Sequence, residues 1–276
     1  MGVRGGGVCL GLDLAACQIY AAADIIWLTN SCSGENPMRL ASCCACVVVM
    51  SGFVVGVGRA QAPAAASDDT GRSIAGGGIT VPGWEGKIDS GAAKAGQTVK
   101  DAKLAPEGKG MRVATGPAVT YWNPKNVAKG DYTVSATFFE PKFQNLNDHP
   151  HPYGIVIGGN DLGTEQQSLL YCAAYGSGTF IVRGFGPDAF QMNGRRGEAN
   201  DAVHKAAGVG QPVTQDIAMS VKGDKVSCSI NGTVVATYDK SAVVTAGKLK
   251  STDGMYGIRF AHNTDAIVSD LKITKP

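Results

Sequence analysis

The sequence lacks a surplus of charge of either sign. Its 276 residues contain 25 Lys and Arg against 23 Asp and Glu, a formal net charge of +2, and no block of like charges interrupts this balance. Proteins that bind nucleic acids or anionic membranes carry a basic stripe or patch. We therefore expect neither a nucleic acid nor an anionic membrane surface as a partner.

Segments with the 3.6-residue period of a helix are almost absent as well. Beyond the N-terminal region only residues 201–207 have a helical pattern, and they lie in a long predicted loop, 186–210, of a length that favours a functional or mobile segment. The sequence also lacks a spacing that would indicate a Cys-His or Ser-His-Asp arrangement, so nothing in it supports nucleophilic catalysis.

The N-terminal region contains an export signal. Arg39 precedes an uncharged stretch of apolar and small residues over 40–57, and Ala60-Gln61-Ala62 has the small-x-small pattern that signal peptidases cut. This pattern predicts a signal peptide over residues 38–62. A secreted or periplasmic protein follows from it, with no membrane insertion after signal cleavage.

Two other interpretations of this region stay open. The small residues before Cys17 and before Cys43 have the pattern of a lipoprotein signal, and the stretch 40–58 approaches the roughly 20 residues of a membrane anchor. We favour cleavage because glycines interrupt the stretch and the cleavage motif ends it. On this interpretation Met38 is the true start, and residues 1–37 are a mis-assigned extension.

The remaining chain divides into a linker and one domain. Residues 63–78 are rich in Ala, Ser and Gly, which predicts a flexible linker, and residues 79–276 form the folded domain. Of the eight cysteines, only Cys172 and Cys228 fall in this domain, and both alternate with apolar residues that face the interior. They could form a disulfide or remain buried thiols. We favour thiols, since nothing in the sequence places their strands side by side.

Regular strand signals fill the domain. Alternating or continuous apolar residues predict strands, and glycine-rich or Asn-Gly turns join several of them. The predicted strands are 132–138, 153–157, 168–174, 179–185, 217–221, 226–230, 233–238, 256–260 and 267–273. About ten strands in a domain of this length predict an all-β fold, an antiparallel two-sheet sandwich.

Three C-terminal segments resemble a known superfamily. The Asn-Gly hairpin over 226–236, the segment 254–260 and the closing segment 268–273 resemble concanavalin A-like lectin and glucanase domains. Among these the chain is most similar to the secreted bacterial 3-keto-disaccharide hydrolase domain, over roughly residues 84–273. The resemblance implies a jelly-roll sandwich with a concave face suited to glycans. It assigns no catalytic residue.

The glucanases of this superfamily use a strand with the pattern Glu-x-Asp-x-x-Glu, which places paired carboxylates on one face. The sequence contains no such run. Glu140 stands alone before Pro141, and Glu198 and Asp201 lie in the long loop. This argues against a two-carboxylate glucanase.

A polar cluster over 147–153 precedes the predicted strand 153–157 and contains His149, His151 and Tyr153. These residues are candidates for ligand binding, or they belong to an ordered surface loop. The i, i+2 spacing directs the two imidazoles to opposite sides of an extended segment, which weakens a shared metal site. We expect no cofactor; if a metal is bound, calcium through Asp148, Asn160 or Asp161 is as plausible as zinc.

Further candidate ligand-binding residues are Asn160 and Asp161, which could bind sugar hydroxyls or form a plain turn. Arg183 shares a strand face with two apolar residues and could hold a ligand or pair with an acid. Arg195 and Arg196 form a glycine-flanked loop tip that could clamp a carboxylated or phosphorylated sugar, or remain solvated. Tyrosines near these segments, Tyr171 and Tyr175 among them, could form an aromatic platform or belong to the core.

The sequence therefore favours a secreted, glycan-recognising β-sandwich domain without catalytic activity. Carbohydrate is the expected partner. A hydrolase that acts on 3-keto-disaccharides or related glycosides is the alternative, and whether the protein is an enzyme stays open. An envelope adhesion module that recognises protein is the second alternative.

Overall fold

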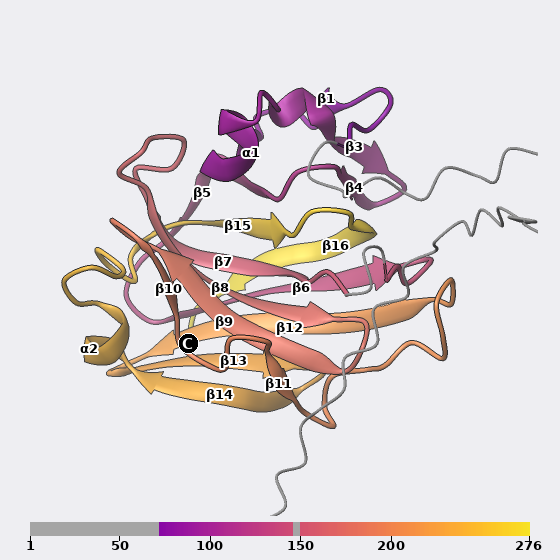
Figure 1. Ribbon diagram of the computed structural model, residues 1–276. Coiled ribbons are helices and arrows are strands. Elements are labelled where there is room, and N and C mark those ends of the chain that lie inside the picture. The colour runs from indigo at the N-terminus through magenta and orange to yellow at the C-terminus, as the bar shows by residue number, and fades with distance from the viewer. Residues whose placement is uncertain (1–71, 146–149) are drawn as a thin grey trace, which may run out of the picture. The chain divides into compact units, whose positions relative to one another are not determined.

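A computed structural model describes residues 72–145 and 150–276 (Figure 1). The predicted extension, signal peptide and most of the predicted linker lie outside the described residues, and so does His149. None of the helices in the described part of the chain is long and apolar enough to cross a membrane.

Two large β-sheets form the domain. Sheet A contains, in spatial order, β1 (Gly78–Ile79), β3 (Ala102–Glu107), β4 (Gly110–Thr115), β16 (Asp265–Thr274), β6 (Tyr132–Glu140), β12 (Val213–Lys222), β13 (Lys225–Ile230) and β14 (Thr233–Asp239). Sheet B contains β10 (Ala189–Gln191), β9 (Thr179–Phe185), β8 (Ser168–Tyr175), β7 (Tyr153–Asn160), β15 (Gly254–Phe260), β5 (Val119–Ala128) and β2 (Glu85–Ile88), and β11 (Glu198–Ala199) also pairs with β9.

The pairing within both sheets is antiparallel, except that β1 runs parallel to β3 among the described strands. Helical structure in the same residues is limited to α1 (Ser90–Lys94), α2 (Lys240–Val243) and the 3-10 turn η2 (Val99–Asp101). The predicted antiparallel two-sheet jelly-roll sandwich is confirmed.

One hydrophobic core fills the space between the sheets. Strands β6 and β12 of sheet A pack against β7 and β8 of sheet B, and Figure 1 shows the two sheets stacked in this way. The alternation of β6 explains the packing, because Tyr132, Val134 and Phe138 enter the core while Thr133 and Ser135 do not.

Cys172 and Cys228 form a disulfide across this core, so our preference for free thiols was wrong. Cys172 lies on β8 of sheet B and Cys228 on β13 of sheet A, with their Cα atoms 6.2 Å apart. The strands are not neighbours in one sheet. They face each other from opposite sheets, an arrangement that strand alternation alone does not reveal.

The predicted helix over 201–207 is also wrong. Its residues form turns, and tertiary hydrogen bonds use the backbone groups that a helix would need. The backbone N–H of His204 donates to Gln215 Oε1 (3.0 Å), Gln215 Nε2 donates to the His204 carbonyl (2.6 Å), and Asn231 Nδ2 donates to the Ala202 carbonyl (2.7 Å).

The end of the predicted linker lies on the domain. Ile74 donates its backbone N–H to the carbonyl of Asp101 (3.1 Å), and Gly78 belongs to β1. The folded domain therefore includes residues 72–78 within the range expected to be a linker.

Candidate functional site

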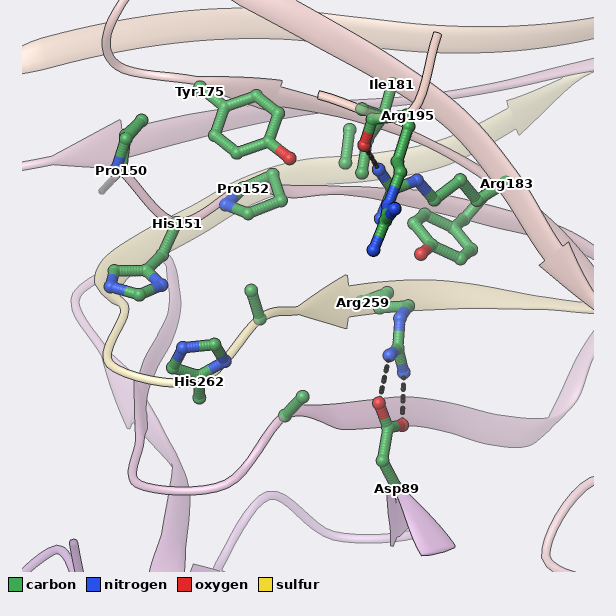
Figure 2. A pocket seen from close by; sticks show the side chains of 14 residues that line it. Asp89, Pro150, His151, Pro152, Tyr175, Ile181, Arg183, Arg195, Arg259 and His262 are labelled. Carbon is green, nitrogen blue, oxygen red and sulfur yellow. Dashed lines mark hydrogen bonds and ion pairs between the residues drawn. The ribbon is translucent and has the colours of Figure 1, made fainter. Parts of the chain in front are cut away.

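A pocket of ≈ 320 Å³ lies on the outer face of sheet B, on the side opposite the core (Figure 2). Its lining residues lie in or next to six strands that are neighbours in the sheet, and in the loop before β11. These strands are β9, β8, β7, β15, β5 and β2. The lining residues are Asp89, Ala118, Pro150, His151, Pro152, Tyr171, Ala173, Tyr175, Ile181, Arg183, Arg195, Arg259, Ala261 and His262.

The floor of this pocket follows from strand register. Ala173 pairs with Gly154 of β7, and Gly154 pairs with Arg259 of β15, so the three positions form one row across the sheet. The glycine leaves the middle of the row without a side chain. A Cβ there would lie 1.9 Å from the carbonyl oxygen of Cys172, so the backbone itself requires glycine at this point.

Arg259 and Asp89 form a buried ion pair at one wall. Arg259 Nη1 and Nη2 donate to Asp89 Oδ1 (2.9 Å) and Oδ2 (2.6 Å), and Nη1 also donates to Thr120 Oγ1 (3.0 Å). Only 8% of the Arg259 side chain is exposed. Burial acts to lower its pKa, but Asp89 and Tyr171 together outweigh burial and the pKa is raised. Arg259 thus stays a cation.

Two aromatic rings pack against the Arg259 guanidinium, and one of them, Tyr171, lines the pocket. The guanidinium carbon of Arg259 lies 5.0 Å from the ring centre of Tyr171 and 4.8 Å from that of Phe185. Contacts of a cation with aromatic faces at such distances are attractive, more so where water is excluded. Arg259, Tyr171 and Phe185 therefore hold each other in place on the outer face.

The opposite wall contains Arg183 and Arg195. As the alternation of β9 predicts, Arg183 shares the outer face with Ile181 and Phe185. The Asn193 side chain holds the loop between β10 and β11 against β9, since its Oδ1 accepts from Val182 N (2.8 Å). The same loop brings the carbonyl oxygen of Arg195 to Arg183, whose Nη2 donates to it.

Tyr175 and two histidines form the rim. The hydroxyl of Tyr175 points into the pocket (Figure 2), and burial raises the pKa of this phenol while the charge of Arg183 acts to lower it. The imidazoles of His151 and His262 meet edge to face, with their centres 4.4 Å apart. His151 is almost fully buried.

The structure brings together three of the predicted site residues. His151, Arg183 and Arg195 all line the pocket, although they are distant in the sequence. Tyr171 and Tyr175, considered as an aromatic platform, line it as well.

Other predicted residues lie elsewhere. The side chain of Tyr153 is fully buried in the core, so it is not part of the pocket. Asn160 lies at the far end of β7, where its Nδ2 donates to the carbonyls of Gly158 and Asp253 (both 3.0 Å). Asp161 begins a turn and pairs with Lys250 (2.5 Å). Arg196 is exposed and does not line the pocket.

Two important residues escaped the sequence analysis. Arg259 and Asp89 are 170 positions apart, and each alone resembles an ordinary surface charge. A signal was present for one of them, because Arg259 is a charged residue within the apolar strand 256–260. An unpaired charge is rarely placed in such a strand.

The calcium alternative concerns Asp148, Asn160 and Asp161. No group of three or more His, Cys, Asp or Glu side chains in the described residues lies close enough to hold a metal ion. Asn160 and Asp161 use their side chains for the contacts given above, and Asp148 lies outside the described residues.

Comparison with protein-family models and with curated protein sequences finds no match. Solved structures do match. The carbohydrate-binding module CBM66 from Bacillus subtilis is 8% identical over 72% of this chain and 99% of its own, with a TM-score of 0.47. An endo-β-1,3-glucanase from Pyrococcus furiosus is 14% identical over 75% of this chain and 92% of its own (TM-score 0.45).

Galectin-11 from sheep is 11% identical over 54% of this chain and 92% of its own, with a TM-score of 0.35. Lectin-like and glucanase structures are the kinds of protein named by the resemblance in the sequence. At these identities and TM-scores the matches carry no argument about a ligand of this chain, which depends on the pocket itself.

Proposed function

We propose that this protein binds carbohydrate in the outer pocket of sheet B. The observation that carries the proposal is the combination of tyrosine rings with arginine donors around one cavity. Sugar rings have apolar C–H faces that pack on aromatic rings, and hydroxyl groups that accept hydrogen bonds from guanidinium groups. A volume of ≈ 320 Å³ lies at the lower end of small-ligand sites, which suits a sugar residue.

The pocket has a single acidic residue among the described ones, which is already paired, and this supports binding without catalysis. Asp89 is the one acidic residue in the lining formed by the described residues, and both of its oxygens accept hydrogen bonds from Arg259. Glycoside hydrolysis ordinarily needs two carboxyl groups on either side of the scissile bond. We therefore keep the 3-keto-disaccharide hydrolase as the alternative, to be tested by product analysis.

The disulfide supports a location outside the cytoplasm. Disulfides such as that between Cys172 and Cys228 persist in secreted and periplasmic proteins and are rare in reducing compartments. This agrees with the export signal in the sequence.

The apolar surface favours glycan over protein as the partner. The large apolar side chains exposed in the described residues are Val127, Phe139, Val209 and Val234, which belong to four separate segments. A protein-adhesion surface needs a contiguous apolar patch.

The test is a thermal-shift screen of the full-length protein against neutral, acidic and 3-keto glycans, with product analysis of the same samples. Binding should raise the melting temperature, and Tyr175→Ala should abolish the shift. Thr137→Ala, a substitution on the outer face of sheet A, is the matched control and should leave the shift unchanged. Absence of a shift with every glycan would refute the proposal, and products would establish the hydrolase.

A further inference from the structure

The pocket contains more positive than negative charge. Arg183, Arg195 and Arg259 line it, against the single described acid Asp89. Because Asp89 and Arg259 neutralise each other in a bidentate pair, the other two guanidinium groups remain. Among the described residues, no ion pair involves Arg183 or Arg195.

Arg183 has an unused donor. Its Nη2 donates to the carbonyl of Arg195, whereas its Nε is buried and has no hydrogen-bond partner within the described part of the protein. A buried donor without a partner is costly, the more so when it carries part of a charge. An acceptor that enters the pocket would remove this cost.

Arg195 adds a second cation to the same cavity. The bonds of Asn193 hold the loop between β10 and β11 against β9, and within this loop the N–H of Gly197 donates to the carbonyl of Gly194 (2.9 Å). Figure 2 shows the side chains of Arg195 and Arg183 at the same wall. The positive charges of Arg183 and Arg195 repel each other at this wall. An anion bound between them is attracted to both, and this attraction offsets the repulsion.

We propose that the pocket recognises an acidic sugar, with a ring carboxylate bound by Arg183 and Arg195 and the ring packed on Tyr175. This inference rests on the proposed function and specifies its ligand class. A planar carboxylate matches the fork of guanidinium donors, which a neutral hydroxymethyl group does not. The contribution of Arg183 to the pKa of Tyr175 agrees with a charge directed at the same space.

The structure also revises which arginines act together. The sequence pairs Arg195 with its neighbour Arg196, but only Arg195 lines the pocket. The arginine that acts with Arg195 is Arg183 of β9, because the loop brings Arg195 next to it. Arg196 is exposed and outside the lining, so it provides a control of equal charge at the adjacent position.

The experiment uses isothermal titration of the full-length protein with galacturonic acid oligosaccharides and with the methyl esters of the same oligosaccharides. The acid form should bind at least about tenfold more tightly, the effect of one charge-assisted hydrogen-bond pair. Arg195→Gln and Arg183→Lys should each remove most of this preference. Arg183→Lys retains the charge and loses the fork. Arg196→Gln should change affinity by less than about twofold.

Dextran sulfate and neutral dextran form a second arm, which distinguishes carboxylate recognition from attraction to any polyanion. Equal binding of acid and ester would overturn the inference and leave carbohydrate binding intact, whereas absence of binding by every glycan would overturn both. Equal losses in the Arg195 and Arg196 variants, or tighter binding of dextran sulfate than of the acid oligosaccharides, would also overturn it. If the Arg183→Lys variant does not melt cooperatively, the result for Arg195→Gln, at an exposed position, decides whether the inference holds.

Discussion

The outer face of sheet A carries small hydroxyl side chains that bond to one another across the strands. Thr133 of β6 bonds to Ser220 of β12 (2.8 Å), and Ser227 of β13 bonds to Thr237 of β14 (3.0 Å). Such pairs satisfy each other's hydrogen-bonding groups without a ligand. In these two pairs the polar groups of the outer face are satisfied internally, although the face also exposes Phe139.

The outer face of sheet B carries large residues instead. Tyr171, Ile181 and Phe185 form a second apolar cluster there, with Arg183 and Arg259 beside them. One of the two arginines has a carboxylate partner and the other has none among the described residues. The comparison shows that two sheets with the same alternation can differ in whether their outward polar groups are satisfied internally, and an unsatisfied face is the better candidate for a ligand site.

The largest effect is expected from removing the disulfide, which joins the two sheets whose outer faces differ. The disulfide closes a loop of 56 positions between the sheets. Replacing both cysteines, Cys172→Ala with Cys228→Ala, should lower the free energy of unfolding by about 4 kcal/mol, because the unfolded chain gains loop entropy. Urea denaturation of the oxidised protein and the variant would measure it. A loss below about 1 kcal/mol would contradict the expectation.

A second test removes the internal partner on sheet B. Arg259→Gln leaves Asp89 without its cation at a site where that carboxyl group is only 33% exposed, and should cost about 3 kcal/mol of unfolding free energy. The double variant Arg259→Gln with Asp89→Asn should recover part of the loss, since no uncompensated charge remains. Equal losses in both variants, measured by denaturation, would show that the ion pair itself is not the cause.

A third test concerns the interior between the faces. Burial raises the pKa of Glu140 from 4.5 to about 7, although the N–H of Gln144 donates to its carboxyl group (3.1 Å) and opposes the shift. Between these two values the folded protein holds a proton that the unfolded chain releases, so stability falls as pH rises from about 4.5 to 7.

Glu140→Gln should remove this slope and raise the free energy of unfolding at pH 8 by roughly 2 to 3 kcal/mol relative to the native protein. The two proteins should be nearly equal at pH 4.5. The exposed Glu165→Gln is the control and should leave the slope in place. Parallel stability curves for the native protein and the Glu140 variant would contradict the assignment.

The smallest effect is expected on the outer face of sheet A. Ser220→Ala removes one side of the bond to Thr133 at a partly exposed position, and should cost less than about 1 kcal/mol. Glycan affinity should be unchanged. A marked loss of affinity in this variant would move the ligand site to the other sheet.

Strand alternation carried most of the fold prediction. The bounds predicted for 179–185 are those of β9, and the strands from β6 onward were located within a few residues, apart from the short β10 and β11. The strands between residues 85 and 128 were missed. Pro124 lies within β5, where a strand prediction ordinarily ends, but it falls beyond the positions paired with β2 and opposite an irregularity in β15, so no ladder bond is lost.

The site was harder to predict because its parts meet only in three dimensions. Arg183 and Arg195 were recognised as candidates one by one, and the loop that joins them depends on the side chain of Asn193. The disulfide was missed for a related reason. Alternation shows that Cys172 and Cys228 face inward, but the pairing of opposite sheets depends on packing over a separation of 56 residues.

The disulfide has a further consequence for the pocket. Cys172 lies between Tyr171 and Ala173, so the strand that lines the pocket on one side is covalently joined to sheet A on the other. The floor is thereby preorganised, and a ligand spends less of its binding energy on ordering β8. Reduction of this one bond, which is buried and lies on the core side of β8, is therefore expected to weaken binding without removing any side chain from the pocket.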